Sequence, residues 1–156
     1  SNDLFFWYQQ LVAESLGKKS QGILPVVSSM PRDNHSLLQL YLDGKKNNFF
    51  TFFIVEEKNS NKINKKNLSQ FYSNLSNKNS FDIVKAQFQA TQNIFQQKKI
   101  PFRSFVVKKR DEKTLGELFI FFILETIMLG RALKIDPFNQ PAVELIKRET
   151  NKILKI

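Results

Sequence analysis

The most informative segment of the chain is Gly130-Arg-Ala-Leu-Lys-Ile-Asp-Pro-Phe-Asn-Gln-Pro-Ala-Val-Glu-Leu-Ile-Lys147. A long apolar segment ends near Gly130. Asp136 then precedes a proline, which pushes Asp136 out of the α region and turns the chain. A second helix is expected to start near Pro141, because the missing N–H of proline costs nothing in the first turn. Asn139 is the expected N-cap of this helix.

Two helices joined by such a turn hold Gln140 and Lys147 in definite places, since Lys147 lies about two turns into the second helix. The stretch resembles the C-terminal signature of the glucose-6-phosphate isomerases. In that signature Gly and Leu precede Asn/Asp-Pro-Phe-Asp-Gln, followed by Pro/Trp-Gly-Val-Glu and a closing Lys. The matching positions are Leu133, Pro137, Phe138, Gln140, Pro141, Val143, Glu144 and Lys147. Asn139 stands where the family usually has Asp, and Ala142 where it usually has Gly.

The composition fits one ordinary globular domain. The chain has 156 residues, of which 42% are hydrophobic, and 16 phenylalanines; a chain of this length buries a substantial core. It has no cysteine, which excludes disulfides and thiolate chemistry and fits a reducing compartment, and we expect a cytoplasmic protein. The apolar run 118–129 is interrupted by Glu125 and is too short to cross a bilayer, so it is expected to be a buried helix and not a membrane span.

The net charge of +10 raises the question of nucleic acid as a partner. Much of the excess lies in an Asn/Lys/Ser-rich stretch at about 58–79 with few apolar residues, which is typical of a solvated insertion. No basic-aromatic motif of a nucleic-acid-binding module is present, so nucleic acid is not an expected partner.

The first helix is expected to end at Gly17, because apolar residues follow the i, i+3, i+4 pattern up to Leu16. Glu14 lies in its last turn. On residue type alone, Glu14 is more simply explained as the partner of Lys18 in a surface i, i+4 pair.

The segment Gln10-Leu-Val-Ala-Glu14-Ser-Leu-Gly-Lys18 changes that balance, because it resembles the isomerase segment in which a Gln precedes Glu-Ser-x-Gly-Lys by four. In the family this Glu moves the proton between the two sugar carbons. The resemblance therefore implies that Glu14 is the catalytic base and that Gln10 contacts the substrate. For Lys147 it implies a part in ring opening, and for Gln140 a hydrogen bond to the substrate.

His35 is the only histidine. We expect it in the first turn of a helix that Asp33 or Asn34 caps and Gly44 closes, a position where histidine is more often structural than catalytic. Arg-Asp-x-His-Ser at 32–36 is similar to the family's Thr/Arg-Asp-Leu-His-Ser, whose His helps to open the sugar ring and reaches a neighbouring subunit's active site. The resemblance therefore implies a ring-opening role for His35 and a homodimer.

Strands and helices alternate along the chain. Buried strands are expected at 22–28, where Pro25 indicates a short or edge strand, at 49–55 and at 101–107. Helices are expected at 81–98 and 114–129, the second opened by a Thr114/Glu117 capping box. This order predicts an α/β fold with an open, mostly parallel sheet flanked by helices. The resemblance implies the three-layer, flavodoxin-like sugar-isomerase (SIS) domain.

The resemblance covers nearly the whole chain outside the insertion and implies that residues 1–156 are the C-terminal SIS domain of an aldose-ketose isomerase of glycolysis and gluconeogenesis. Its substrate would be a sugar phosphate, with no cofactor and no metal, since the chain lacks a ligand cluster. The N-terminal SIS domain, with the phosphate-binding loop and an arginine, is absent from this chain, which alone should be inactive. A non-catalytic sugar-phosphate-binding SIS module is the alternative.

Overall fold

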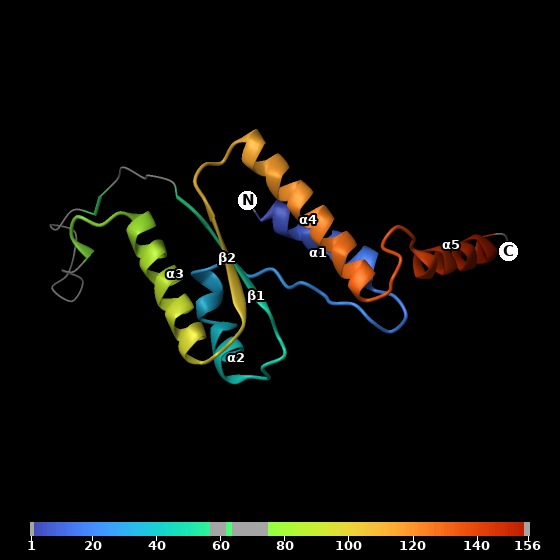
Figure 1. The fold of residues 1–156 in the computed structure, drawn as a ribbon, viewed down its shortest axis with the longest axis horizontal. Helices are drawn as coiled ribbons and strands as arrows, with labels where there is room; N and C mark the ends of the chain where they lie inside the picture. Colours follow the sequence, from blue (N-terminus) through green and yellow to red (C-terminus); the bar gives the residue numbers. More distant parts are fainter. Residues whose placement is uncertain (1, 57–61, 64–74, 155–156) are drawn as a thin grey trace. The chain divides into compact units, whose positions relative to one another are not determined.

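The computed structural model describes residues 2–56, 62–63 and 75–154 (Figure 1). The chain divides into two compact units. Unit 1 comprises Ser1–Ser28 and Leu115–Ile156, and unit 2 comprises Ser29–Thr114. The polar insertion expected at about 58–79 lies mostly outside the described residues.

Unit 2 contains two parallel strands that a helix connects. Strand β1 (Phe50–Val55) leads through helix α3 (Ser80–Gln97) to strand β2 (Phe102–Val107). The strands pair in parallel, with Phe50 opposite Phe102 and Val55 opposite Val107. The α/β class, the parallel pairing and both strand positions are therefore confirmed. Parallel neighbours need a crossover connection, which α3 supplies.

The core of unit 2 is an aromatic cluster between the sheet and α3. Phe95 is only 1% exposed, and its ring lies 4.9 Å from that of Phe50 and 5.1 Å from that of Phe52, both edge to face. Phe50 also meets the ring of Tyr41 at 5.0 Å, which belongs to helix α2 (Leu38–Asp43). Figure 1 shows α2 and α3 beside the strands. Such ring pairs add to the stabilisation that apolar burial gives.

The start of α3 is fixed by a reciprocal cap. The Asn79 side chain accepts from the Asp82 backbone N–H, and the Asp82 carboxylate accepts from the Asn79 backbone N–H. Two backbone donors that the helix cannot satisfy are thereby paired.

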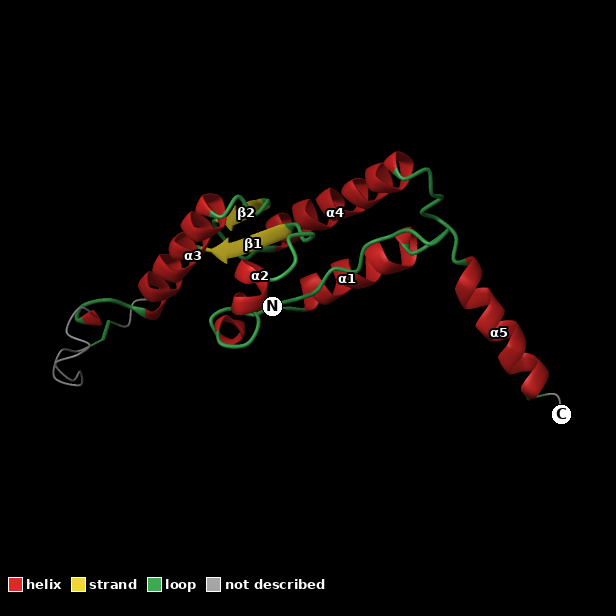
Figure 2. Ribbon diagram, turned by 90° about the horizontal axis from the view of Figure 1, so that it is seen from below, coloured by secondary structure: helices red, strands yellow, loops and turns green. Residues whose placement is uncertain are grey.

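Unit 1 is helical. It contains α1 (Asp3–Leu16), most of α4 (Glu112–Ala132) and α5 (Pro141–Ile153), which Figure 2 shows in red. Helices α1 and α4 pack through rings: the centroids of Trp7 and Phe119 lie 4.5 Å apart, and those of Tyr8 and Phe122 lie 4.3 Å apart. The Tyr8 hydroxyl donates to Glu125 at 3.1 Å. This bond gives the polar interruption in the apolar run a partner.

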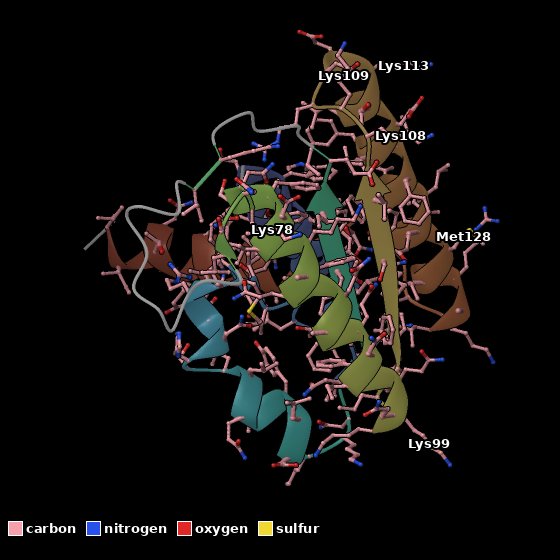
Figure 3. All side chains as sticks on the ribbon, turned by 90° about the vertical axis from the view of Figure 1, so that its left-hand side faces the viewer. Lys78, Lys99, Lys108, Lys109, Lys113 and Met128 are labelled. Carbon is pink, nitrogen blue, oxygen red and sulfur yellow. The ribbon has the colours of Figure 1, made fainter. Side chains whose placement is uncertain are left out.

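The prediction that residues 118–129 form a buried helix is only partly right. One stripe of α4 is buried, at Phe122, Thr126 and Gly130. Leu124 and Met128 are 54% and 70% exposed, and Figure 3 labels Met128. Periodicity identified the helix, but apolar character around the whole circumference does not show which face the chain itself covers.

The strand expected at 22–28 is wrong, because this segment has no strand in the structure. Ile23, Leu24 and Val26 are exposed. Pro25 has no N–H to donate to a ladder, and its carbonyl accepts a hydrogen bond from the Gln9 side chain. An apolar, β-branched run forms a strand only where a neighbouring strand offers it an edge.

The start of α4 also differs from the expected Thr114/Glu117 capping box. The helix begins at Glu112, and the Asp111 carboxylate accepts from the Thr114 backbone N–H at 2.9 Å. Hydrogen bonds from Thr114, then from Lys109, lower the pKa of Asp111 to about 2. Thr114 therefore stands three residues after the capping side chain and is not the cap itself.

Candidate active site

The candidate site lies in unit 1 and is centred on the carboxylate of Glu14, in the last turn of α1. Its Oε1 accepts from Gln10 Nε2, one turn earlier, at 2.9 Å. Its Oε2 accepts from Gln140 Nε2, also at 2.9 Å, across 126 residues of sequence. Three of the five site residues predicted from the sequence, Gln10, Glu14 and Gln140, are therefore in contact. The two amides donate to different oxygens of the carboxylate.

The three side chains are exposed to solvent, and a small pocket of about 80 Å³ opens beside Glu14. Its walls are the end of α1 and the start of α5, contributed by Ala13, Glu14, Gly17, Lys18, Gln140, Pro141, Ala142 and Val143. A carboxylate beside such a pocket can accept a proton from a bound molecule.

The turn that delivers Gln140 follows directly from the end of α4. Lys134 has a positive φ of 56°. The N–H of Ile135 donates to the carbonyl of Gly130 at 2.8 Å, and that of Lys134 to the carbonyl of Arg131 at 3.1 Å. This pair of bonds is the Schellman pattern, which satisfies the last carbonyls of a helix and turns the chain away from it.

Gly130, near the end of α4, and Pro137, in the turn, are in close contact. A Cβ on Gly130 would lie 3.2 Å from the Cβ of Pro137 and 3.3 Å from the carbonyl oxygen of Ile135. Glycine at this position therefore lets the turn approach the helix.

The expected N-cap of α5 is wrong. Gln140 occupies the N-cap position, and no side chain caps the helix there. The Asn139 amide donates instead to Asp136 Oδ2 at 2.6 Å, while Asp136 Oδ1 accepts from the Phe138 backbone N–H at 3.0 Å. Asp136 thus organises the turn, as Asp commonly does by bonding backbone two residues on. The expected helix start at Pro141 is confirmed.

Lys18 makes a contact that the sequence did not indicate. Its ammonium donates to the Asp136 carbonyl at 2.6 Å, so the surface-pair explanation of Glu14 and Lys18 does not describe the structure. The only hint in the sequence was the position of Lys18 at the end of the Glu-Ser-x-Gly-Lys motif.

Lys147 lies on α5, where the sequence placed it. Its Nζ is 2.7 Å from Glu144 Oε1, and its side chain is 63% exposed. The structure therefore engages Lys147 with a neighbour on its own helix, and not with Glu14.

His35 belongs to unit 2, and its local setting differs from the prediction. It follows a short 3₁₀ helix, Arg32–Asn34, as its C-cap, and α2 begins only at Leu38. Asp33 is buried and takes hydrogen bonds from Arg32 at 2.8 Å and from the Ser29 backbone N–H at 2.6 Å, which lower its pKa. Asp33 is therefore committed to the turn before His35 and does not cap α2.

The described residues contain no group of three or more His, Asp or Glu side chains that could hold a metal ion. In the same part of the chain, no helix combines the length and the apolarity needed to cross a bilayer.

Comparison with curated proteins gives matches over nearly the full chain. A glucose-6-phosphate isomerase of Methanocaldococcus jannaschii is 34% identical over 96% of this chain. Proteins of the same name from Mycoplasmopsis pulmonis and Campylobacter jejuni are 38% and 35% identical over 97% and 95% of it. The chain is related in sequence to the glucose-6-phosphate isomerases. The resemblance inferred from the motifs is therefore confirmed.

The match to these isomerases covers only part of each of them. The chain spans 37%, 36% and 38% of the length of the three relatives. A crystal structure of a hypothetical protein from Thermus thermophilus aligns with 96% of this chain and 37% of that protein, with a TM-score of 0.80 and 26% identity. No family model matches the chain.

Proposed function

We propose that this chain is the C-terminal part of an isomerase that interconverts glucose 6-phosphate and fructose 6-phosphate through an enediol intermediate. The observation that carries the proposal is the Glu14 carboxylate, which lies beside a pocket between the amides of Gln10 and Gln140. The choice of substrate is supported by the relatives, which are named glucose-6-phosphate isomerases.

Glu14 would act as the proton carrier. It would take the proton from C2 of the open-chain aldose, giving an enediolate, and return it to C1, while a hydroxyl proton passes from O2 to O1. A base needs a fixed direction as well as a free lone pair. Gln10 and Gln140 set the direction of both carboxylate oxygens, and their amides can also donate to sugar hydroxyls.

Lys147 and His35 would serve ring opening, which requires a proton to be moved between the ring oxygen and the C1 hydroxyl. Lys147 projects from α5, the helix that follows Gln140, and lysine supplies hydrogen-bond donors. Its ion pair with Glu144 is exposed and so is a weak restraint. For His35 we propose action in the site of a neighbouring subunit, so that the working enzyme is a homodimer. We place this enzyme in the cytoplasm, because a chain without cysteine fits a reducing compartment.

The remaining groups would come from a further SIS domain that precedes this chain in the longer protein. That domain would supply the phosphate-binding loop and the arginine facing the enediolate. The face of α4 that unit 1 leaves exposed, at Ile120, Leu124 and Met128, is an apolar surface of the kind that such a domain would cover. Without that domain the substrate would not be positioned and the charge of the transition state would not be stabilised. The chain alone should therefore be inactive.

The test is a coupled assay for glucose 6-phosphate formation from fructose 6-phosphate by the full-length gene product. Glu14→Gln should lower kcat by about 10²–10⁴-fold, with substrate binding largely kept, because a base acts in the transition state. Glu149→Gln is the matched control, since Glu149 pairs with Lys152 on the exposed surface of α5, and it should leave the rate unchanged.

A Glu14→Gln protein with a near-normal rate would remove Glu14 from the proposed role. A full-length protein that binds fructose 6-phosphate without turnover would favour the non-catalytic module. The chain alone should give background rates, and a rate within about tenfold of the full-length protein would show that the essential groups had been assigned to the wrong part.

A further inference from the structure

Gln140 reaches Glu14 only because the turn that carries it is held against the end of α1. The Glu14–Gln140 hydrogen bond is exposed, and a single bond of this kind contributes little net stability. On its own this bond is a weak restraint on the turn, and a second contact between α1 and the turn adds to it.

Lys18 supplies such a contact. It follows Glu14 by one helical turn, directly after Gly17, the C-cap of α1. Its ammonium donates to the Asp136 carbonyl at 2.6 Å. This bond is exposed and involves a charged group, as the Glu14–Gln140 bond does, so the two contacts together restrain the turn.

The contact continues from Asp136 toward Gln140. The two carboxylate oxygens of Asp136 accept from the Phe138 backbone N–H and from the Asn139 amide, and Gln140 is the next residue. Lys18 and Glu14, at the end of α1, thus each bond to the turn, one to Asp136 and the other to Gln140. Lys18 is also one of the residues that line the pocket.

We propose that Lys18 is a positioning residue of the active site: it fixes the Asp136–Gln140 turn so that the Gln140 amide orients the Glu14 carboxylate. The proposal rests on the proposed isomerase function for its kinetic consequence. It differs from direct substrate binding by Lys18, because its effect must pass through Gln140.

A double-mutant cycle in the full-length gene product tests this route, because coupling shows whether two residues act together. Lys18→Met keeps the stem and removes the donor. It should lower kcat/KM about tenfold, as expected for a misplaced catalytic group, and mainly through kcat. In a Gln140→Ala background the same change should have less than about a twofold effect, because there is no amide left to misplace.

Two further variants define the result. Lys18→Arg keeps a charged donor and should retain most of the activity. Lys19→Met is the matched control, because Lys19 is the next residue and its contact with the Lys134 carbonyl is long, at 3.4 Å; activity should stay unchanged. An equal loss from Lys18→Met in both backgrounds, or no loss in either, would overturn the proposal.

Hydrogen exchange measured by mass spectrometry separates this proposal from the proposed function. Lys18→Met should speed exchange in peptides that cover residues 134–140, while Lys19→Met should not. This readout needs no turnover, so a wild-type protein without isomerase activity would refute the function and leave the role of Lys18 to be judged by exchange. Unchanged exchange at the turn in Lys18→Met would overturn the positioning role.

Discussion

The two units use their apolar side chains differently. In unit 2 the rings of β1, β2 and α3 close on one another around Phe95. In unit 1 a seam of rings joins α1 to α4, but Leu124 and Met128 of α4 stay exposed. The β1–α3–β2 segment therefore builds its core from its own rings, while the helices of unit 1 present more apolar surface than unit 1 itself covers. Exposed apolar helix faces are typical of surfaces that another element covers.

The largest test of this comparison is Phe95→Ala set beside Met128→Ala. Removing a buried ring leaves a cavity, and Phe→Ala typically costs about 3–5 kcal/mol of unfolding free energy. Met128 is 70% exposed, so Met128→Ala should change stability by less than about 0.5 kcal/mol. Urea unfolding measures both values. Similar losses of unfolding free energy in the two variants would contradict the difference between the buried core of unit 2 and the exposed face of α4.

A smaller effect is expected where α4 meets the candidate site. Gly130→Ala should lower the free energy of unfolding by about 1 kcal/mol. The new Cβ crowds Pro137 and Ile135, and such overpacking costs up to about 3 kcal/mol. This cost exceeds the gain of about 1 kcal/mol in helix propensity.

Gly116 of the same helix provides the control, because a Cβ there meets nothing within 4 Å. Gly116→Ala should stabilise by about 0.5–1 kcal/mol. Thermal unfolding of both variants gives the two signs, and a stabilising Gly130→Ala would mean that the turn does not press on α4.

The smallest effect concerns the start of α4 and its dependence on pH. The pKa of Asp111 is about 2, below the ordinary 3.8, so the unfolded chain takes up the proton first as the pH falls. The stabilising contribution of this carboxylate is therefore full above about pH 4 and is lost as the pH falls through about 2.

Asp111→Asn keeps an acceptor at the cap but does not titrate. Urea midpoints of wild type and Asp111→Asn should differ at pH 5 and converge as the pH approaches about 2. Parallel curves over this range would show that Asp111 has no altered pKa in the folded chain.

The sequence predicted most of the secondary structure because local signals were strong. Both strands, the helix between them and the end of α1 at Gly17 lie within a residue or two of their expected places. The misses fall where a local signal competes with its surroundings. Asn139 is a good cap by residue type but bonds to Asp136, and the Thr114/Glu117 pair lies behind an Asp that caps first.

The candidate site, too, could be predicted from the sequence only in part. Motif spacing selected Gln10, Glu14 and Gln140, and the i, i+4 relation of the first two already puts them on one helix face. Glu14 and Gln140 are 126 residues apart, so their spacing in the sequence does not show that they lie close together. The same holds for Lys18 and Asp136.

From the sequence alone, most helices, both strands of the sheet and a set of candidate site residues could be predicted. Those properties depend on periodicity, capping and residue type over a few neighbouring positions. Three features could be read only from the folded chain: residues 22–28 form no strand, one stripe of α4 is buried, and Gln140 meets Glu14. Each of these depends on a partner distant in sequence, because burial and hydrogen bonding are settled by the surface that the rest of the fold provides.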